Sequence, residues 1–302
     1  MTINTGSFSK LLWPGLNAIY NKTVNDWKEE YSQVFDIYKS AKAWEEDLGV
    51  TGMGLLTRRG EGAPIQYDTM HQGFLTRYTH AEFAGGFKIT QIAMEDDQYG
   101  FVGEQGAKKL GRSEKQTRET VAWLVLNRAF NSSYTGGDAK ELLATDHPNA
   151  GGAGGTYANE LATAADISEA SLEQAFIDIA KYTDDRGLKM AVRPKKIVVP
   201  VDLDFEVNKI MKTEYEVGTA NNTVNIIRGR FPGGVMVSHW LTDTDAWFIT
   251  TDVDHGLKFF ERRAPKFETD NDWDTDNAKF KVSTRYSVGW TNPKALFGSP
   301  GA

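Results

Sequence analysis

The chain has no cysteine among its 302 residues and only five histidines. The missing thiols exclude disulfide bonds and thiolate metal sites as sources of stability or chemistry. Long apolar runs are absent as well, since no window approaches the roughly 18 uninterrupted apolar residues typical of a membrane span. The N-terminal residues include no continuous apolar h-region. We therefore expect neither a signal peptide nor a membrane segment.

Short motifs of catalytic and metal sites are also missing. The histidines show no HExxH or other short-range ligand spacing, and no Gly-x-Ser-x-Gly elbow occurs. The glycine cluster at residues 151–155 has no P-loop lysine after it, so it indicates a flexible loop. The acidic run at residues 268–276 departs from the EF-hand template at Thr275 and Lys281, which favours a solvated turn over a calcium site. We predict no catalytic residue, cofactor or metal ion, and mostly ordinary surface or loop histidines.

The charge balance does not favour wholesale binding to nucleic acid. The formal net charge is −7, and acidic domains are not attracted to phosphate backbones. One basic stripe precedes the apolar part of a predicted helix, but glutamates interrupt it. We interpret it as a solvated face, made of Lys108, Lys109, Arg112, Lys115 and Arg118.

Residues 166–212 predict a helix–strand–helix nucleus. Ser168 is a good N-cap, and apolar residues follow it at helical spacing. Residues 197–201 form a short, wholly apolar strand pattern, and Val207 and Ile210 mark a second helix. This arrangement is typical of an α+β core.

The N-terminal third predicts three different kinds of structure. Residues 1–24 suggest a weakly structured arm with apolar side chains that need a partner surface. Residues 26–48 have a helical pattern. Alternating segments at residues 64–70 and 74–81 flank a turn at residues 71–73, which predicts a projecting β-hairpin.

The longest predicted helix spans residues 96–130, with a capping box at Ser113 and Gln116. Its apolar face places Leu124 and Val125 in the core. Residues 131–165 are small and polar, which predicts a long surface loop. Further strands are expected at residues 223–228, 234–239, 247–251, 257–262 and 280–290. The strands at residues 247–251 and 257–262 are expected to form a hairpin.

This order of parts resembles the major capsid protein of tailed bacteriophages, in the Hong Kong phage capsid fold, from residue 7 to about residue 300. Several stretches resemble the branch that includes the Mu-type head subunit, namely residues 87–90 (FKIT), 95–100 (EDDQYG), 193–200 (RPKKIVVP) and 242–248 (TDTDAWF). The resemblance implies an α+β fold with an N-terminal arm, an extended β-hairpin loop, a long spine helix, and peripheral and axial domains.

The implied division assigns the arm to residues 1–24, peripheral segments to 25–50, 96–138 and 251–290, the extended hairpin loop to 51–95, the axial domain to 139–250, and a C-terminal return to 291–302. The resemblance implies a structural, non-enzymatic subunit that forms hexamers and pentamers of an icosahedral shell around phage double-stranded DNA. Its partners would be further copies of itself, a portal, and scaffolding or decoration proteins. It would assemble in the host cytoplasm and reside in the virion.

Two departures and two alternatives remain. The chain has no long N-terminal scaffolding segment, and no Lys–Asn crosslinking pair can be matched. One alternative is the shell protein of a bacterial nanocompartment, which shares the fold class but encloses an enzyme. The other is a hydrolytic or metal-dependent enzyme whose site residues are far apart in the sequence.

Subunit contacts in such a shell come from extended arms and hairpins. We expect aromatic burial to supply most of the contact energy and arginines to set the register, because exposed ion pairs alone add little. The predicted inter-subunit contacts are Leu12 and Trp13 in the arm, and Arg58, Arg59, Tyr67, Phe74, Arg77 and Tyr78 in the hairpin.

Overall fold

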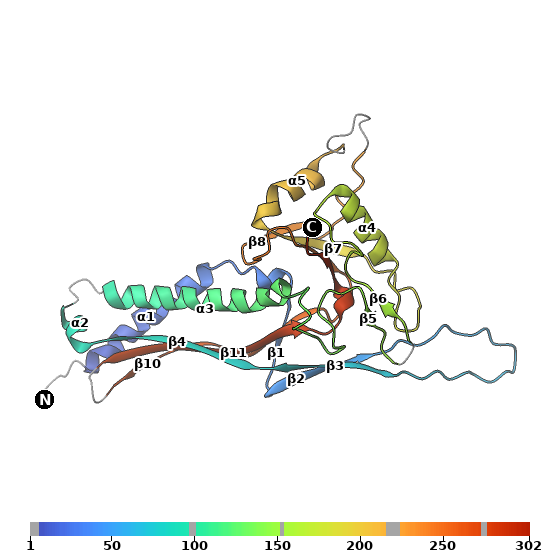
Figure 1. The fold of residues 1–302 in the computed structure, drawn as a ribbon. Helices are drawn as coiled ribbons and strands as arrows, with labels where there is room; N and C mark the ends of the chain where they lie inside the picture. The colour runs from blue at the N-terminus through green and yellow to red at the C-terminus, as the bar shows by residue number, and fades with distance from the viewer. Residues whose placement is uncertain (1–5, 97–100, 152–153, 216–223, 273–276) are drawn as a thin grey trace.

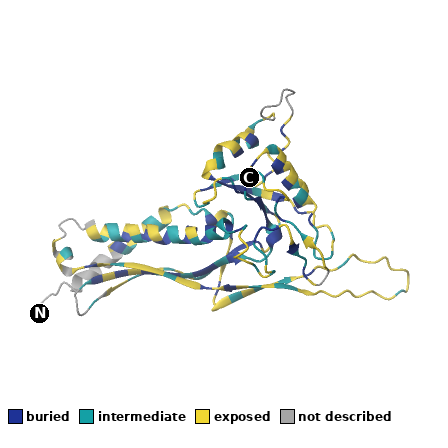
Figure 2. Ribbon diagram, viewed as in Figure 1, coloured by how far each residue is buried: buried dark blue, intermediate teal, exposed yellow. Residues whose placement is uncertain are grey.

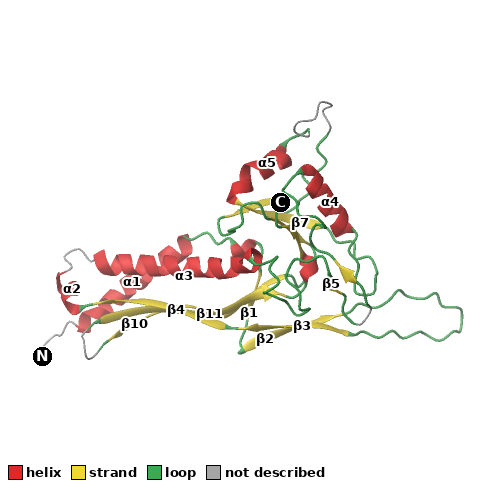
Figure 3. Ribbon diagram, in the orientation of Figure 1, coloured by secondary structure: helices red, strands yellow, loops and turns green. Residues whose placement is uncertain are grey.

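The computed structural model describes residues 6–96, 101–151, 154–215, 224–272 and 277–302. The molecule has an elongated part, in which helices lie along a long sheet, and a smaller part with a second sheet and two helices (Figure 1). A two-stranded ribbon extends past both parts and ends in a loop (Figures 1 and 3). Within the described residues, no helix is long and apolar enough to cross a membrane.

The elongated part is built on a four-stranded sheet of order β1-β10-β11-β4. β1 (Asp36–Lys39) is parallel to β10 (Leu257–Asn271), while β11 (Ala278–Trp290) pairs antiparallel with both β10 and β4 (Ala81–Ile89). α1 (Gly6–Asp26) and α3 (Phe101–Asn127) lie along this sheet, and α2 (Gln91–Asp96) joins β4 to α3 (Figure 1). The one-turn helix η1 (Tyr31–Gln33) follows α1.

The smaller part has the sheet order β12-β9-β7-β8. Its strands are β7 (Pro194–Pro200), β8 (Val235–Ser238), β9 (Trp247–Thr251) and β12 (Leu296–Ser299), and only the β7–β8 pairing is parallel. Its helices and minor elements are α4 (Glu169–Ala180), η2 (Val201–Leu203), α5 (Asp204–Lys212), η3 (Pro293–Ala295) and the short strands β5 (His147–Pro148) and β6 (Thr156–Tyr157). The predicted helix–strand–helix nucleus is confirmed, with Ser168 as the N-cap of α4.

The two parts share a hydrophobic core. One cluster joins the end of α3 to both sheets, through Trp123, Leu126, Val198, Phe248, Phe259 and Tyr286. Within it, Phe259 stacks on Tyr31 and on Tyr286 at ring-centroid distances of 4.9 Å. Interior packing of this kind fixes the orientation of the smaller part on the larger one, as the buried band across the junction in Figure 2 illustrates.

The first 50 residues differ from the sequence prediction. The predicted N-terminal arm is largely α1, whose Leu16 and Tyr20 are buried against α3 and the sheet. The predicted helix at residues 26–48 is wrong, because that segment contains η1, β1 and the first part of β2 (Trp44–Val50). In β2 the less exposed face carries the polar residues Glu45 and Asp47. The alternation of the strand therefore does not show as an alternation of apolar and polar residues.

The predicted long helix is shorter and has no cap at Ser113, which lies inside α3. Glycines in the first half of α3 allow close packing against neighbouring elements. A Cβ added at Gly106 would lie 2.6 Å from the ring of Phe87 on β4. Residues 131–165 are irregular as predicted but not superficial, since Leu142, Leu143 and Asn159 are buried.

Two strand predictions were also wrong. The strands at residues 247–251 and 257–262 do not form a hairpin, because β9 and β10 belong to different sheets. In residues 224–228 only an isolated bridge from Val224 to Tyr215 is present. Of the acidic run, residues 268–271 end β10, while residues 273–276 lie outside the described residues, as do residues 152–153 of the glycine cluster.

Part of the basic stripe is buried, which contradicts the interpretation of a solvated face. Three of the five histidines are exposed, as predicted, and the other two are buried. His80 is 4% exposed and lies between the hydroxyls of Ser40 and Ser287, at 3.0 and 2.9 Å. The imidazole of His147 contacts Asp138 at 2.6 Å. Arg118 is buried between Glu114 and Glu261, at 2.7 Å from each carboxylate, because the sheet covers this face of α3.

Candidate functional site

The most distinctive surface is the end of the ribbon formed by β2 and β3 (Gln72–Thr79). These strands pair antiparallel from Trp44–Thr79 to Val50–Gln72. Beyond them, the two limbs of residues 51–71 continue side by side without a regular ladder (Figure 1). Hydrogen bonds between Thr51 and the backbone of His71 close the loop. The amide of Thr51 donates to the carbonyl oxygen of His71 at 3.0 Å, and the amide of His71 donates to the hydroxyl oxygen of Thr51 at 2.9 Å.

The turn of this ribbon lies at its tip rather than at residues 71–73. The amide of Ala63 donates to the carbonyl of Gly60 at 3.2 Å, and Thr57 contacts Gln66 across the limbs at 3.1 Å. Residues 71–73 instead belong to the neck and to β3. The predicted strand at residues 64–70 is therefore wrong, although the projecting ribbon itself is present.

The loop exposes large apolar side chains to solvent. Leu55 is 79% exposed, Leu56 is 100% exposed and Tyr67 is 92% exposed, while Met53, Ile65 and Met70 are more than half exposed. Single exposed apolar residues are ordinary, but a contiguous group indicates an interaction surface. Figure 2 shows most of this loop in the colour of exposed residues.

The predicted contact residues lie in different environments. Arg58, Arg59 and Tyr67 lie on the exposed loop. Arg77 pairs with Glu46 on the adjacent strand at 2.6 Å and lies over the ring of Trp44. Phe74 is half-buried near the neck. Leu12 and Trp13 lie in a part of α1 whose side chains are outside the described residues.

Tyr78 is buried inside its own subunit. Its ring lies 4.8 Å from that of Phe260, and its hydroxyl is 2.6 Å from the hydroxyl of Thr291. A Cβ added at Gly289 would lie 2.9 Å from the ring, so the glycine makes room for it. Burial raises the pKa of Tyr78 above its usual range. In the isolated subunit this side chain fastens the ribbon to the body.

A second fastening, which the sequence analysis missed, involves Asp47 on β2. Its carboxylate pairs with the buried Lys258 of β10 and accepts a bond of 2.6 Å from Thr291. Burial opposes ionisation of Asp47, but the bonds from Lys258 and Thr291 outweigh it and lower the pKa. Lys258 is 211 residues away in the sequence, and no local pattern connects the two.

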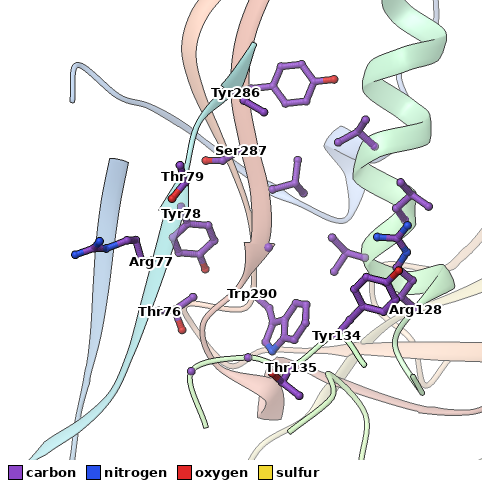
Figure 4. A pocket seen from close by; sticks show the side chains of 18 of the residues that line it. Thr76, Arg77, Tyr78, Thr79, Arg128, Tyr134, Thr135, Tyr286, Ser287 and Trp290 are labelled. Atoms are coloured by element: carbon purple, nitrogen blue, oxygen red, sulfur yellow. The ribbon is translucent and has the colours of Figure 1, made fainter. Parts of the chain in front are cut away.

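A groove lined by both apolar and polar side chains opens beside the ribbon, between β3, β11 and the end of α3 (Figure 4). It has a volume of about 520 Å³. In Figure 4, Tyr78 and Trp290 come from the strands, while Arg128 and Tyr134 face them from the helix and the loop after it. Arg128 lies 4.1 Å from the centre of the Tyr134 ring, which fixes one wall of the groove.

The groove corrects the predicted position of Leu124. Its side chain lines the groove and is only partly buried, and Val125 beside it is also partly buried. The fully enclosed leucine of this turn is Leu126. The end of α3 packs against both sheets through Trp123 and Leu126. The helix therefore buries a different face near its end from the one that periodicity suggests.

A family model described as "Phage capsid protein" matches residues 75–298, the greater part of the chain. The chain belongs to the phage capsid protein family. It is a major capsid shell protein, as the sequence resemblance implied. No curated protein sequence matches it.

Solved capsid structures share its fold at low sequence identity. A chain of the procapsid of bacteriophage JBD30 is 16% identical over 99% of this chain and 76% of that one, with a TM-score of 0.55. A capsid chain of cyanophage P-SCSP1u is 10% identical, covers 91% of this chain and 88% of its own, and has a TM-score of 0.59. A virus-like particle from Pyrococcus furiosus is 13% identical, with coverages of 95% and 98% and a TM-score of 0.54. These similarities confirm the α+β Hong Kong phage capsid fold.

Proposed function

We propose that this capsid protein assembles as hexamers and pentamers into an icosahedral shell that encloses phage double-stranded DNA, and that it has no catalytic role. The observation that carries the proposal is a loop of apolar side chains with no cover in the subunit, on a member of a capsid family. A two-stranded ribbon alone is marginal in water. A neighbouring subunit would supply the missing contacts.

We propose that the loop binds in the groove of an adjacent copy. The loop and the groove lie on different surfaces of the subunit, so their pairing is heterologous, and it generates rings when the rotation between neighbours closes. The loop offers Leu55, Leu56 and Tyr67, and the groove offers Leu124 and aromatic side chains. Joint burial would remove these apolar side chains from water.

The domain roles are part of this proposal. Residues 139–250 would form the axial domain near the centre of each ring, and the elongated part would form its periphery. The predicted arm contacts at Leu12 and Trp13, and those at Arg58 and Arg59, would lie between subunits.

The net charge of −7 fits a container that holds DNA without sequence-specific binding, because phosphate contacts would bring strong, salt-dependent affinity. We also propose assembly in the host cytoplasm with a portal, and with scaffolding or decoration proteins. A nanocompartment shell is less favoured, since the family model that matches is that of a phage capsid protein. Copurified DNA rather than an enzyme would distinguish the two.

Replacement of residues 53–69 by a short Gly-Ser linker tests the loop. It keeps the Thr51–His71 neck, so we expect a folded subunit that no longer forms shells in negative-stain micrographs. A milder variant, Leu55→Ser with Leu56→Ser, should also lose assembly. The control Glu61→Ala alters one exposed polar residue at the tip and should assemble normally. Closed particles of normal size from the linker variant would refute the proposed contact.

A further inference from the structure

The exposed loop contacts the smaller part of the molecule at the turn formed by residues 183–189. This turn is rigid by its own hydrogen bonds. The Asp184 carboxylate accepts from the amides of Arg186 and Leu188 at 2.9 and 2.8 Å, and the amide of Asp184 donates to the Leu188 carbonyl at 2.7 Å. Gly187 adopts a φ of 81°, which favours glycine. Arg186 is therefore presented from a fixed backbone.

Arg186 binds the C-terminal limb of the loop through two nitrogen atoms. Its guanidinium contacts Asp68 at 2.5 Å through Nη1 and donates to the carbonyl of Thr69 through Nη2. The same Asp68 carboxylate accepts from the amides of Gly54 and Thr69, at 2.7 and 2.8 Å. Bonds from Gly54, Arg186 and Thr69 lower the pKa of Asp68 to about 2. Asp68 thus ties both limbs of the loop to the turn.

The N-terminal limb of the loop passes close to the turn at two glycines. A Cβ added at Gly52 would lie 3.2 Å from the Asp184 carboxylate, and one at Gly54 would lie 3.2 Å from both Arg186 and Asp68. Contacts this short leave little room for a side chain without movement of the neighbouring groups. The limb is therefore packed against the turn, not merely near it.

The other side of the turn is anchored in the body of the molecule. Asp185 pairs with the Nζ of Lys294 at 3.5 Å, and this lysine is buried below the ring of Tyr157, 4.3 Å from its centre. Lys294 lies in η3, next to strand β12 of the second sheet. A continuous set of contacts therefore runs from the buried sheet to the loop.

We infer that Arg186 is a positioning residue for assembly, which fixes the direction in which the loop leaves the subunit. The inference rests on the proposed function of the loop. Exposed ion pairs contribute little to folding stability, and the Arg186 and Asp68 side chains are 24% and 42% exposed. The value of this contact is directional, because arginine binds two acceptors in a planar geometry that lysine does not reproduce.

The absence of cysteine allows a direct test in the full chain. Spin labels on Glu61→Cys at the loop tip and Glu173→Cys on α4 report the distance between loop and smaller part by pulsed electron paramagnetic resonance. We expect a narrow distance distribution in the otherwise unchanged subunit, kept below the concentration at which it assembles. Arg186→Ala and Asp68→Asn should each broaden it, Arg186→Lys should restore it in part, and Lys189→Ala, a charge lost from the same turn, should not alter it.

These readouts separate the inference from the proposed function. The melting temperature should stay unchanged in all four variants, while Arg186→Ala and Asp68→Asn should yield fewer closed particles and more irregular ones. An unchanged distance distribution in Arg186→Ala would overturn the inference, as would disagreement between Arg186→Ala and Asp68→Asn. Failure of the unmutated chain to form shells would instead contradict the proposed function, and the distance measurement would still decide whether Arg186 orients the loop.

Discussion

Truncation of two leucines on one turn of α3 separates folding from assembly. Leu126 is 1% exposed inside the core cluster that joins both sheets, whereas Leu124 lines the groove and is partly exposed. Leu126→Ala should lower the free energy of unfolding by about 2–5 kcal/mol, the range for a leucine removed from a packed core. Leu124→Ala should cost only about 1 kcal/mol, roughly half the transfer free energy of a buried leucine.

Urea denaturation of the unassembled subunit measures both costs. At an m-value of about 2 kcal/mol/M, Leu126→Ala should lower the midpoint by about 1–2.5 M and Leu124→Ala by about 0.5 M. Leu124→Ala should nevertheless raise the subunit concentration needed for shell formation, followed by light scattering, because the groove loses apolar surface for the neighbouring loop. Equal midpoint shifts for the two variants, or unimpaired assembly of Leu124→Ala, would refute this reasoning.

Three further predictions concern buried groups. Burial lowers the pKa of His80, so the stability it contributes is complete above the unfolded pKa of about 6.5 and declines as the pH falls through that value. The urea midpoint should therefore be lower at about pH 5.5 than at about pH 7.5. An equal decrease in His80→Gln would contradict this prediction. Asp47→Asn should cost roughly 2 kcal/mol in chemical denaturation, less than for a fully enclosed pair because Asp47 is partly exposed, and an unchanged midpoint would show that Lys258 needs no partner. Gly106→Ala should lower the melting temperature despite the higher helix propensity of alanine, since the added methyl group would meet Phe87. A stabilised variant would mean that α3 and β4 pack less tightly.

The sequence predicted elements whose pattern is local. The nucleus of α4, β7 and α5 and the strand β11 were found because an N-cap, an apolar run or an alternation identifies them. The segment containing β2 was not found, because its inward residues Glu45 and Asp47 find their partners in Ser40 and Lys258. Polar alternation has no hydrophobic signature.

The contact surfaces were predictable only in part. Composition identified a projecting ribbon, yet it misplaced the turn, because the limbs of residues 51–71 are held by side chains such as Asp68 rather than by a strand ladder. In the sequence, Tyr78 lies in the same alternating segment as another aromatic residue predicted to contact a neighbouring subunit. Its burial depends on Phe260 and Thr291, far along the chain, and only the tertiary structure brings them together.

Electron cryo-microscopy of particles formed by the purified full chain tests the central claim most directly. The account predicts closed icosahedral shells in which residues 51–71 of one subunit occupy the groove beside Leu124 and Trp290 of its neighbour. It would be contradicted if the chain formed no shells at concentrations that keep it folded, or if the shells left that groove empty and the loop in solvent.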